Sequence, residues 1–187
     1  MICLRPYDAS DEALRASILT LLSDAFGEEG TPYYELAMDH LYDADHTFLL
    51  SEEDASLVAV ALVVDYVDPT DGRWAYLYSL TTREDHRGEG LMSRLYREVM
   101  EPRLVERGYR GACLVPATSS LVGFYKSWGF SLLRAADESM PITPGRRATD
   151  YLLTAYGQSC IDNPLPFRMI KPFGHTDDSY RLISPLD

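Results

Sequence analysis

Two glycines in a polar segment between a strand pattern and a helix pattern could form a binding site for an anion. Residues 76–82 are mostly apolar or aromatic, and Gly88 and Gly90 precede apolar residues at helical spacing. Glycine lets the backbone approach a ligand closely, and the free N–H groups at the start of a helix attract a pyrophosphate. The pattern therefore indicates an anion-binding turn, although a tight turn between a strand and a helix would also explain it.

Two common nucleotide-binding motifs do not match this segment. A P-loop requires Lys followed by Ser or Thr after its last glycine, whereas Leu91 and Met92 follow Gly90. A dinucleotide-binding fingerprint requires an acidic residue at the end of the next strand, and residues 114–117 there are Leu, Val, Pro and Ala. The turn is therefore assigned to neither of these classes of site.

A second motif, rich in aromatic residues, lies beyond the next strand pattern. Residues 124–130 read Phe-Tyr-Lys-Ser-Trp-Gly-Phe. By residue type and spacing alone, Tyr125 and Trp128 would form the buried face of a short helix.

The order and spacing of these two motifs resemble the GCN5-related N-acetyltransferases, the GNAT family. The resemblance rests on Arg87-Gly88-Glu89-Gly90 after a strand and on Phe124–Phe130 beyond the next one. Leu4-Arg5-Pro6 with Asp11, leading into a helix, is also similar to the start of many members. The resemblance implies an acetyltransferase domain over residues 1–156. Residues 157–187 would be a C-terminal extension packed on the domain or at a dimer interface.

The resemblance also implies a reaction, in which an acetyl group passes from acetyl-CoA to an amine that attacks the thioester directly. Residues 87–92 would hold the pyrophosphate, Leu80 and Thr82 would offer backbone hydrogen bonds to the pantetheine arm, and Tyr125 would be the general acid. Thr118 stands where members commonly have Asn and can still donate a hydrogen bond. The implied cofactor contacts are Leu80, Thr82, Arg87, Gly88, Glu89, Gly90, Leu91, Met92 and Thr118.

In such folds the first two helices and their loop usually form a wall of the acceptor site, which here means residues 26–34. Carboxylates beside aromatic rings suit a cation, through charge and a cation–π attraction of about 0.5–2 kcal/mol. We therefore expect a primary amine on a cationic small molecule or peptide, although a plain acidic surface loop would have the same composition. The expected acceptor contacts are Glu28, Glu29, Tyr33, Tyr34 and Tyr78, and the general base is left open among Glu28, Glu29, Glu35, Asp65 and Tyr78.

One departure from the family pattern supports a second hypothesis. The pattern has Gly or Ala where this chain has Met92, which would put a large side chain near the phosphates. The chain could therefore be a non-catalytic domain of the same fold that binds or senses acyl-CoA. Tyr125 favours catalysis, because acetyl transfer needs an acid to protonate the leaving thiolate.

Other residue types that often mark chemistry show no supporting pattern. Four histidines lack metal-ligand spacing, three cysteines form no CxxC pair, and no GxSxG elbow surrounds Ser119 and Ser120. We therefore expect no metal and no disulfide framework. The histidines are His40, His46, His86 and His175, and the cysteines are Cys3, Cys113 and Cys160.

Apolar spacing and turn residues predict the elements that would position these motifs. In the first half they favour helices at 11–25 and 31–42 and antiparallel strands at 2–7, 47–50, 56–66 and 74–82. In the second half they favour a helix from Gly90 to Gly108 with a kink at Pro102, a helix at 121–128, and strands at 112–115, 130–134 and 149–155. The fold class is α/β (α+β), a mixed and mostly antiparallel central sheet flanked by helices, with one parallel crossover.

Charge is distributed unevenly along the 187 residues. The net charge is −12, but residues 1–72 hold sixteen acidic and two basic side chains, whereas residues 73–130 hold nine basic and six acidic. Nucleic-acid binding is disfavoured, because it normally requires a basic face. The longest apolar run, Leu57–Val64, is too short to span a membrane, and charged residues near Met1 argue against an export signal. We expect a soluble cytoplasmic protein, with a homodimer left open.

Overall fold

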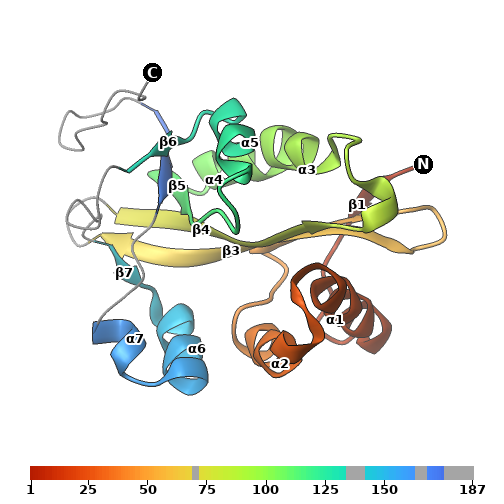
Figure 1. Cartoon of the computed structure of the whole chain (residues 1–187), viewed down its shortest axis with the longest axis horizontal. Helices are drawn as coiled ribbons and strands as arrows, with labels where there is room; N and C mark the ends of the chain where they lie inside the picture. The colour runs from red at the N-terminus through yellow and green to blue at the C-terminus, as the bar shows by residue number, and fades with distance from the viewer. Residues whose placement is uncertain (69–71, 134–141, 163–167, 175–187) are drawn as a thin grey trace.

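One mixed sheet forms the centre of the molecule, and helices cover both of its faces (Figure 1). The computed structural model describes residues 1–68, 72–133, 142–162 and 168–174. The strand order is β1-β2-β3-β4-β5-β8-β6, and β7 pairs with β3. The strands are β1 Cys3–Arg5, β2 Thr47–Ser51, β3 Leu57–Asp68, β4 Gly72–Thr82, β5 Gly111–Leu114, β6 Ser131–Leu132, β7 Thr143–Pro144 and β8 Met169–Pro172.

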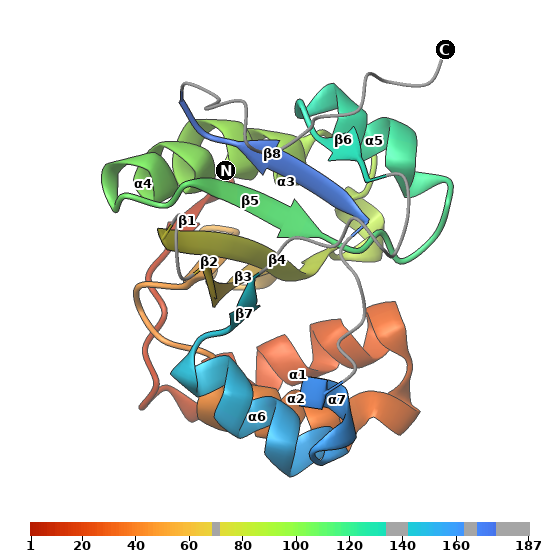
Figure 2. The ribbon, with the colours of Figure 1, turned by 90° about the vertical axis from the view of Figure 1, so that its left-hand side faces the viewer.

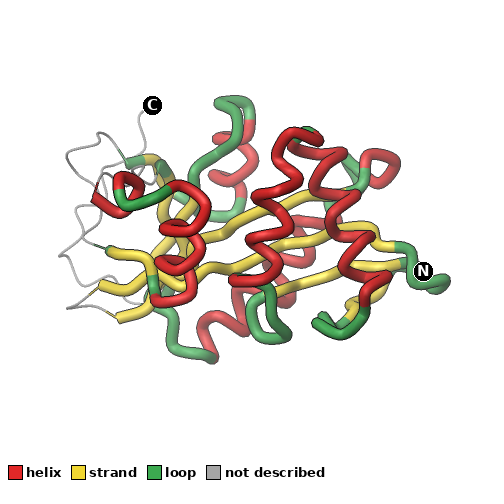
Figure 3. Tube along the Cα trace, turned by 90° about the horizontal axis from the view of Figure 1, so that it is seen from below, coloured by secondary structure: helices red, strands yellow, loops and turns green. Residues whose placement is uncertain are grey.

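The helices form two groups on opposite faces of the sheet. Figure 2 shows α3, α4 and α5 above the strands and α1, α2, α6 and α7 below them. Figure 3, seen from below, shows the lower helices lying across the strands. The α-helices are α1 Glu12–Phe26, α2 Thr31–His40, α3 Leu91–Arg94, α4 Glu101–Glu106, α5 Leu121–Ser127, α6 Arg146–Tyr156 and α7 Ser159–Asp162; the short 3₁₀ helices are η1 Glu28–Gly30 and η2 Glu84–His86, and the π-helical segment is η3 Leu95–Met100.

Each face of the sheet has its own apolar core, because β3 is buried on both sides. Odd-numbered residues from Ala59 to Val63 pack in the cluster that includes α3, η3, α4 and α5. Even-numbered residues from Val60 to Val64 pack in the cluster that includes α1, α2 and α6. The alternation follows the two-residue period of a strand and explains why the run from Leu57 to Val64 is continuously apolar.

The predicted order of elements in the first half is confirmed. Strands β1 to β4 pair antiparallel in sequence order, and β4 pairs parallel with β5 across the crossover. Helix α1 begins after Asp11, whose carboxylate accepts a hydrogen bond of 2.9 Å from the N–H of Leu14. The helix predicted from Gly90 to Gly108 is present as α3, η3 and α4 in succession. Pro102 stands in the first turn of α4, directly after the π-helical segment.

The strand predicted at residues 149–155 is wrong, because these residues belong to helix α6. Ala148 and Tyr151 are buried, and Leu152 and Ala155 pack partly buried against the same cluster. These spacings of three and four residues match the helical period. The β-branched Thr149 and Thr154 favour a strand by residue type, but the Thr149 hydroxyl donates to the carbonyl oxygen of Pro144 before the helix and the Thr154 hydroxyl to that of Asp150.

The chain after Tyr156, expected to be an extension packed on the domain or at a dimer interface, supplies an inner strand of the sheet. Residues Met169–Pro172 form β8, which pairs antiparallel with β5 on one side and β6 on the other. The strand predicted at 130–134 is present as the short β6, and Arg134 lies outside the described residues. In the described part of the chain, no helix is long and apolar enough to cross a membrane.

Candidate active site

Strand β4 contains a bulge near its end. Ser79 and Leu80 of β4 stand opposite one residue of β3, Ala61. Ser79 has a φ of 54°, a left-handed conformation that residues with side chains seldom adopt. Because of the extra residue, Tyr78 packs on the α1, α2 and α6 side whereas Leu80 packs on the α3 to α5 side. The bulge thus places Tyr78 and Leu80 on opposite faces of the sheet.

Strands β4 and β5 separate after a short parallel pairing. The pairing ends at Tyr76 and Cys113, and β5 ends one residue later, at Leu114. Strand β4 continues to Thr82, so residues 78–82 have no strand partner on the β5 side in the described part of the chain. Peptide groups on such an open edge can hydrogen-bond an extended ligand.

The turn after β4 presents an exposed backbone. Gly88 and Gly90 have φ values of +85° and +74°, and a Cβ atom added to either would have nothing within 4 Å. Gly90 immediately precedes α3, and the first N–H groups of a helix have no acceptor within the helix. The Arg87 side chain is held beside the turn by a hydrogen bond of 3.1 Å from its Nε to the carbonyl oxygen of Thr82.

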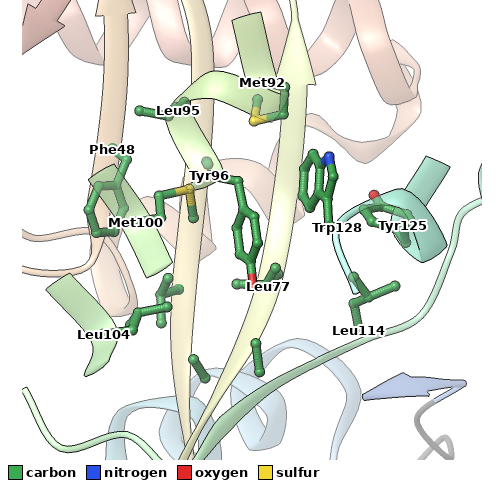
Figure 4. Close-up of a cluster of buried hydrophobic side chains, with 14 of the residues drawn as sticks. Phe48, Leu77, Met92, Leu95, Tyr96, Met100, Leu104, Leu114, Tyr125 and Trp128 are labelled. Carbon is green, nitrogen blue, oxygen red and sulfur yellow. The ribbon is translucent and has the colours of Figure 1, made fainter. Parts of the chain in front are cut away.

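The side chain of Met92 points into the protein core. It is only 8% exposed and packs in the same cluster as Leu95 and Tyr96 (Figure 4). The expected large side chain near the phosphates is therefore absent from the open side of the turn, where the backbone of α3 begins. This removes the observation on which the hypothesis of a non-catalytic domain rests.

A group of charged side chains braces this turn, and sequence reasoning missed it. The Arg83 guanidinium bonds to the carboxylates of Glu52, at 2.9 Å, and Asp85, at 2.7 Å. His86 Nδ1 lies 3.2 Å from the Glu89 carboxylate. Hydrogen bonds to Asp85 and Glu52 raise the pKa of Arg83. Because Glu52 lies between β2 and β3, these contacts tie the turn to a distant part of the chain.

Tyr125 lies in α5, on the same face of the sheet as the turn. Its ring packs edge-on against Trp128, with the ring centroids 5.3 Å apart, and it is 8% exposed (Figure 4). Burial raises the pKa of Tyr125, so the phenol stays protonated at neutral pH. Thr118, before α5, is exposed, and its hydroxyl lies 2.7 Å from that of Ser120.

The loop between α1 and α2 presents two kinds of side chain. Glu28 and Glu29 in η1 are exposed to solvent. The Tyr34 hydroxyl donates to the carbonyl oxygen of Gly27 at 3.0 Å, so Tyr34 braces the loop. Tyr33 is 42% exposed, and its ring stacks on Tyr156 of α6 with centroids 5.3 Å apart.

Helix α6 adds aromatic residues that the sequence interpretation did not include. The Tyr151 hydroxyl lies 3.3 Å from that of Tyr78, one residue before the bulge. Burial raises the pKa of Tyr78, which leaves this phenol a poor general base. The helical spacing of Ala148, Tyr151 and Leu152 is the signal that could have revealed this helix.

Asp65, another candidate base, belongs to a separate polar cluster at the far end of β4. It accepts a hydrogen bond from the Tyr109 hydroxyl, and His46 Nε2 lies 3.6 Å away. Burial favours the neutral carboxyl, but the hydrogen bonds outweigh it, and the pKa of Asp65 is lowered. A cavity of about 270 Å³ adjoins this cluster, lined by His46, Asp65, Arg146 and Arg147 among others. Asp65 pairs with Ala75, near the start of β4, whereas the bulge and the glycine turn lie at its end.

The bulge of β4, its open edge and the glycine turn thus follow one another along the chain, and Trp128 joins α5 to α3 through a hydrogen bond to Ser93. A family model, the Acetyltransferase (GNAT) family, matches residues 15–130. The chain belongs to the GNAT family. The match begins at Arg15, within α1, and ends at Phe130, so it includes the bulge, the glycine turn and Tyr125. GNAT acetyltransferases use acetyl-CoA as the acyl donor.

Solved GNAT structures share the fold at low sequence identity. An acetyltransferase of the GNAT family from Staphylococcus aureus has a TM-score of 0.60 at 13% identity, covering 91% of this chain and 97% of that one. A GNAT family acetyltransferase from Brucella melitensis, in complex with acetyl-CoA, has a TM-score of 0.52 at 21% identity, covering 70% and 83%.

Some similar structures are much longer than this chain. A GCN5-related N-acetyltransferase from Kribbella flavida has a TM-score of 0.53 at 19% identity, and the match covers 71% of this chain but only 34% of that one. No curated protein sequence matches the chain. In the described residues, no group of three or more His, Cys, Asp or Glu side chains could hold a metal ion.

Proposed function

We propose that this GNAT protein transfers an acetyl group from acetyl-CoA to a primary amine on a cationic small molecule or peptide, by direct attack. The observation that carries the proposal is the open edge of β4 beside the glycine turn. An extended backbone edge and the start of a helix adjoin there, and the buried Tyr125 packs in the same apolar cluster as Leu80 and Leu91.

The glycine turn fits the pyrophosphate of acetyl-CoA. The open space beside Gly88 and Gly90 allows the backbone of residues 87–92 to approach the phosphates, and N–H groups at the start of α3 can donate to them. Residues 73–130 are also net basic, which suits an anionic ligand. Arg87 would add a positive charge. Glu89, Leu91 and Met92 would contact the phosphates through their backbone and not through their side chains.

The free edge of β4 fits the pantetheine arm, which is a chain of amides. Leu80 and Thr82 would form backbone hydrogen bonds with it, because no strand of the described residues pairs with β4 there. Thr118, on the other side of the separation between β4 and β5, would donate one hydrogen bond from its hydroxyl. The bulge at Ser79 stores backbone strain at this point, as binding sites often do.

When bound, acetyl-CoA supplies a thioester whose carbonyl carbon an amine can attack. Tyr125 would act as the general acid, donating the proton of its hydroxyl to the leaving sulfur atom. Its raised pKa keeps that proton in place until the sulfur develops negative charge. Packing against Trp128 fixes the ring, so the hydroxyl is already oriented before the reaction begins.

The acceptor would approach from the side of α1 and α2. Glu28 and Glu29 would attract a cation, while Tyr33 and Tyr34 would contribute aromatic surface and Tyr78 would face the attacking amine. The strongly acidic charge of residues 1–72 supports this direction of approach. Since Tyr34 already bonds to Gly27, it would act through its ring and not through its hydroxyl.

Release of free thiol tests the proposal. The protein is incubated with acetyl-CoA and a panel of small cationic amines and basic peptides, and free CoA is measured with a thiol reagent. The proposal expects thiol release that depends on both substrates and an acetylated amine seen by mass spectrometry. Calorimetric binding of acetyl-CoA without thiol release for any amine would favour an acyl-CoA-binding domain. If acetyl-CoA did not bind at all, both the acetyltransferase and the acyl-CoA-binding domain would be excluded.

A further inference from the structure

A row of tyrosine side chains leads from the bulge of β4 to the surface of α6. The hydroxyls of Tyr78 and Tyr151 lie 3.3 Å apart, and either can donate to the other. Tyr156 packs edge-on against Tyr151, with ring centroids 6.2 Å apart. Tyr151 is 3% exposed and Tyr156 is 50% exposed, so the row runs from the interior to solvent.

The charge environment of Tyr78 restricts what its hydroxyl can do. The titratable groups that act on it include the phenols of Tyr34, Tyr151 and Tyr156, and Tyr42, Tyr66 and Tyr76 also interact with it. Burial raises the pKa of both Tyr78 and Tyr151. Neither hydroxyl can therefore serve as a base that is already deprotonated. Each can accept a proton only while it passes its own proton onward.

Helix α6 holds Tyr151 in a fixed place. At the start of the helix, the Arg147 guanidinium bonds to the Asp43 carboxylate and, at 3.0 Å, to the carbonyl oxygen of His40. The N–H of Gly145 donates to the carbonyl oxygen of Asp65 at 2.8 Å. These contacts fix α6 against α2 and β3, which keeps the two hydroxyls within hydrogen-bonding distance.

We infer that Tyr78, Tyr151 and Tyr156 form the path by which the acceptor amine loses its proton, an inference that rests on the proposed acetyl transfer. An N–H bond of the attacking amine breaks, its electron pair stays on nitrogen, and an O–H bond forms on Tyr78. The proton of Tyr78 moves to Tyr151, that of Tyr151 to Tyr156, and that of Tyr156 to water. Each phenol ends with one proton, and nothing is oxidised or reduced.

Helix α6 lies outside residues 15–130, which the family model matches. Tyr151 and Tyr156 therefore lie outside the matched region, whereas Tyr78 lies within it. The path gives α6, in the C-terminal half of the chain, a role in removing the proton of the acceptor. The carboxylates of η1 are exposed on the acceptor side. Glu28 and Glu29 then attract the cation, while the phenols remove its proton.

The substitution Tyr151→Phe tests the path, because it removes one hydroxyl and keeps the ring. Turnover is measured with two acceptors of one skeleton, one protonated at the assay pH and one made neutral by fluorination beside the amine. We expect kcat to fall roughly tenfold or more for the protonated acceptor. For the neutral acceptor we expect a change of less than about twofold, because that amine arrives with one proton fewer. Tyr7→Phe, which removes a phenol from the same core cluster away from this row, should affect neither.

The two acceptors separate a proton path from a structural role. An equal fall in kcat for both acceptors would assign Tyr151 to packing and overturn the inference, as would an unchanged kcat for the protonated one. In both cases the wild-type protein still acetylates amines, so the proposed function stands. Absence of thiol release by the wild-type protein with every amine would instead overturn the proposed function and this inference together.

Discussion

The indole nitrogen of Trp128 donates a hydrogen bond of 3.0 Å to the hydroxyl oxygen of Ser93, which joins α5 to α3. The same ring stacks on Tyr96, with centroids 4.5 Å apart, and contacts Tyr125 edge-on. One indole thus links the helix that follows the glycine turn to the helix that carries the proposed acid. The relative position of these two parts of the site depends on this contact.

We expect Ser93→Ala to lower the free energy of unfolding by about 1–3 kcal/mol, because a buried indole N–H loses its acceptor. Urea denaturation of both proteins measures the difference. Ser17→Ala is the matched control, since Ser17 lies on the exposed side of α1 and its hydroxyl bonds only to a helix carbonyl. Its effect should stay within about 0.5 kcal/mol. Similar values for the two variants would contradict the importance of the Ser93 bond.

The substitution Tyr125→Phe should lower kcat by about 10²–10⁴-fold, because the general acid is lost. The affinity for acetyl-CoA should change little, since the ring and its packing against Trp128 remain. Steady-state kinetics with a saturating amine and calorimetry with acetyl-CoA measure the two quantities. Wild-type turnover in this variant would exclude Tyr125 as the acid.

The substitution Gly90→Val should weaken acetyl-CoA binding by roughly tenfold or more, because the side chain fills the space that the phosphates need. A left-handed φ also makes valine strained there, at a cost of about 1–2 kcal/mol. Gly108→Val separates the two effects, since Gly108 has a similar φ of +77° and follows α4. Both variants should lose thermal stability, but only Gly90→Val should lose affinity in calorimetry. A similar loss of affinity in both would point to general destabilisation.

The stability of the protein should fall at alkaline pH because of His46. Hydrogen bonds to Asp43 and Asp65 raise the pKa of His46 to about 9, although burial opposes this. Since the pKa in the unfolded chain is about 6.5, the stabilising contribution is complete below about pH 6.5 and lost as the pH rises through about 9. The advantage of the wild type over His46→Gln should shrink by up to roughly 3 kcal/mol across this range.

Denaturant unfolding of these two proteins at several pH values checks the prediction. A constant difference between them would mean that the proton on His46 contributes nothing to the fold.

The sequence by itself determined the features that depend on neighbouring residues. The glycine turn and the start of α3 follow from Gly88 and Gly90, because their positive φ and the free helix N–H groups need no distant partner. The alternation in β3 and the cap at Asp11 are local in the same sense. The order and spacing of the two motifs predicted the family, and apolar spacing and turn residues predicted the antiparallel first half and the parallel crossover.

Only the tertiary structure decided which distant side chains meet. The pairs Trp128 with Ser93, Arg83 with Glu52 and Tyr151 with Tyr78 join residues far apart in the chain, and no periodic pattern marks them. Residues 149–155 were wrongly predicted as a strand for the same reason, since packing of α6 against the sheet and α2 overrides the preference of its threonines. Neighbouring residues determine local steric limits and local hydrogen bonds, whereas long-range contacts form only when the whole chain buries its apolar surface.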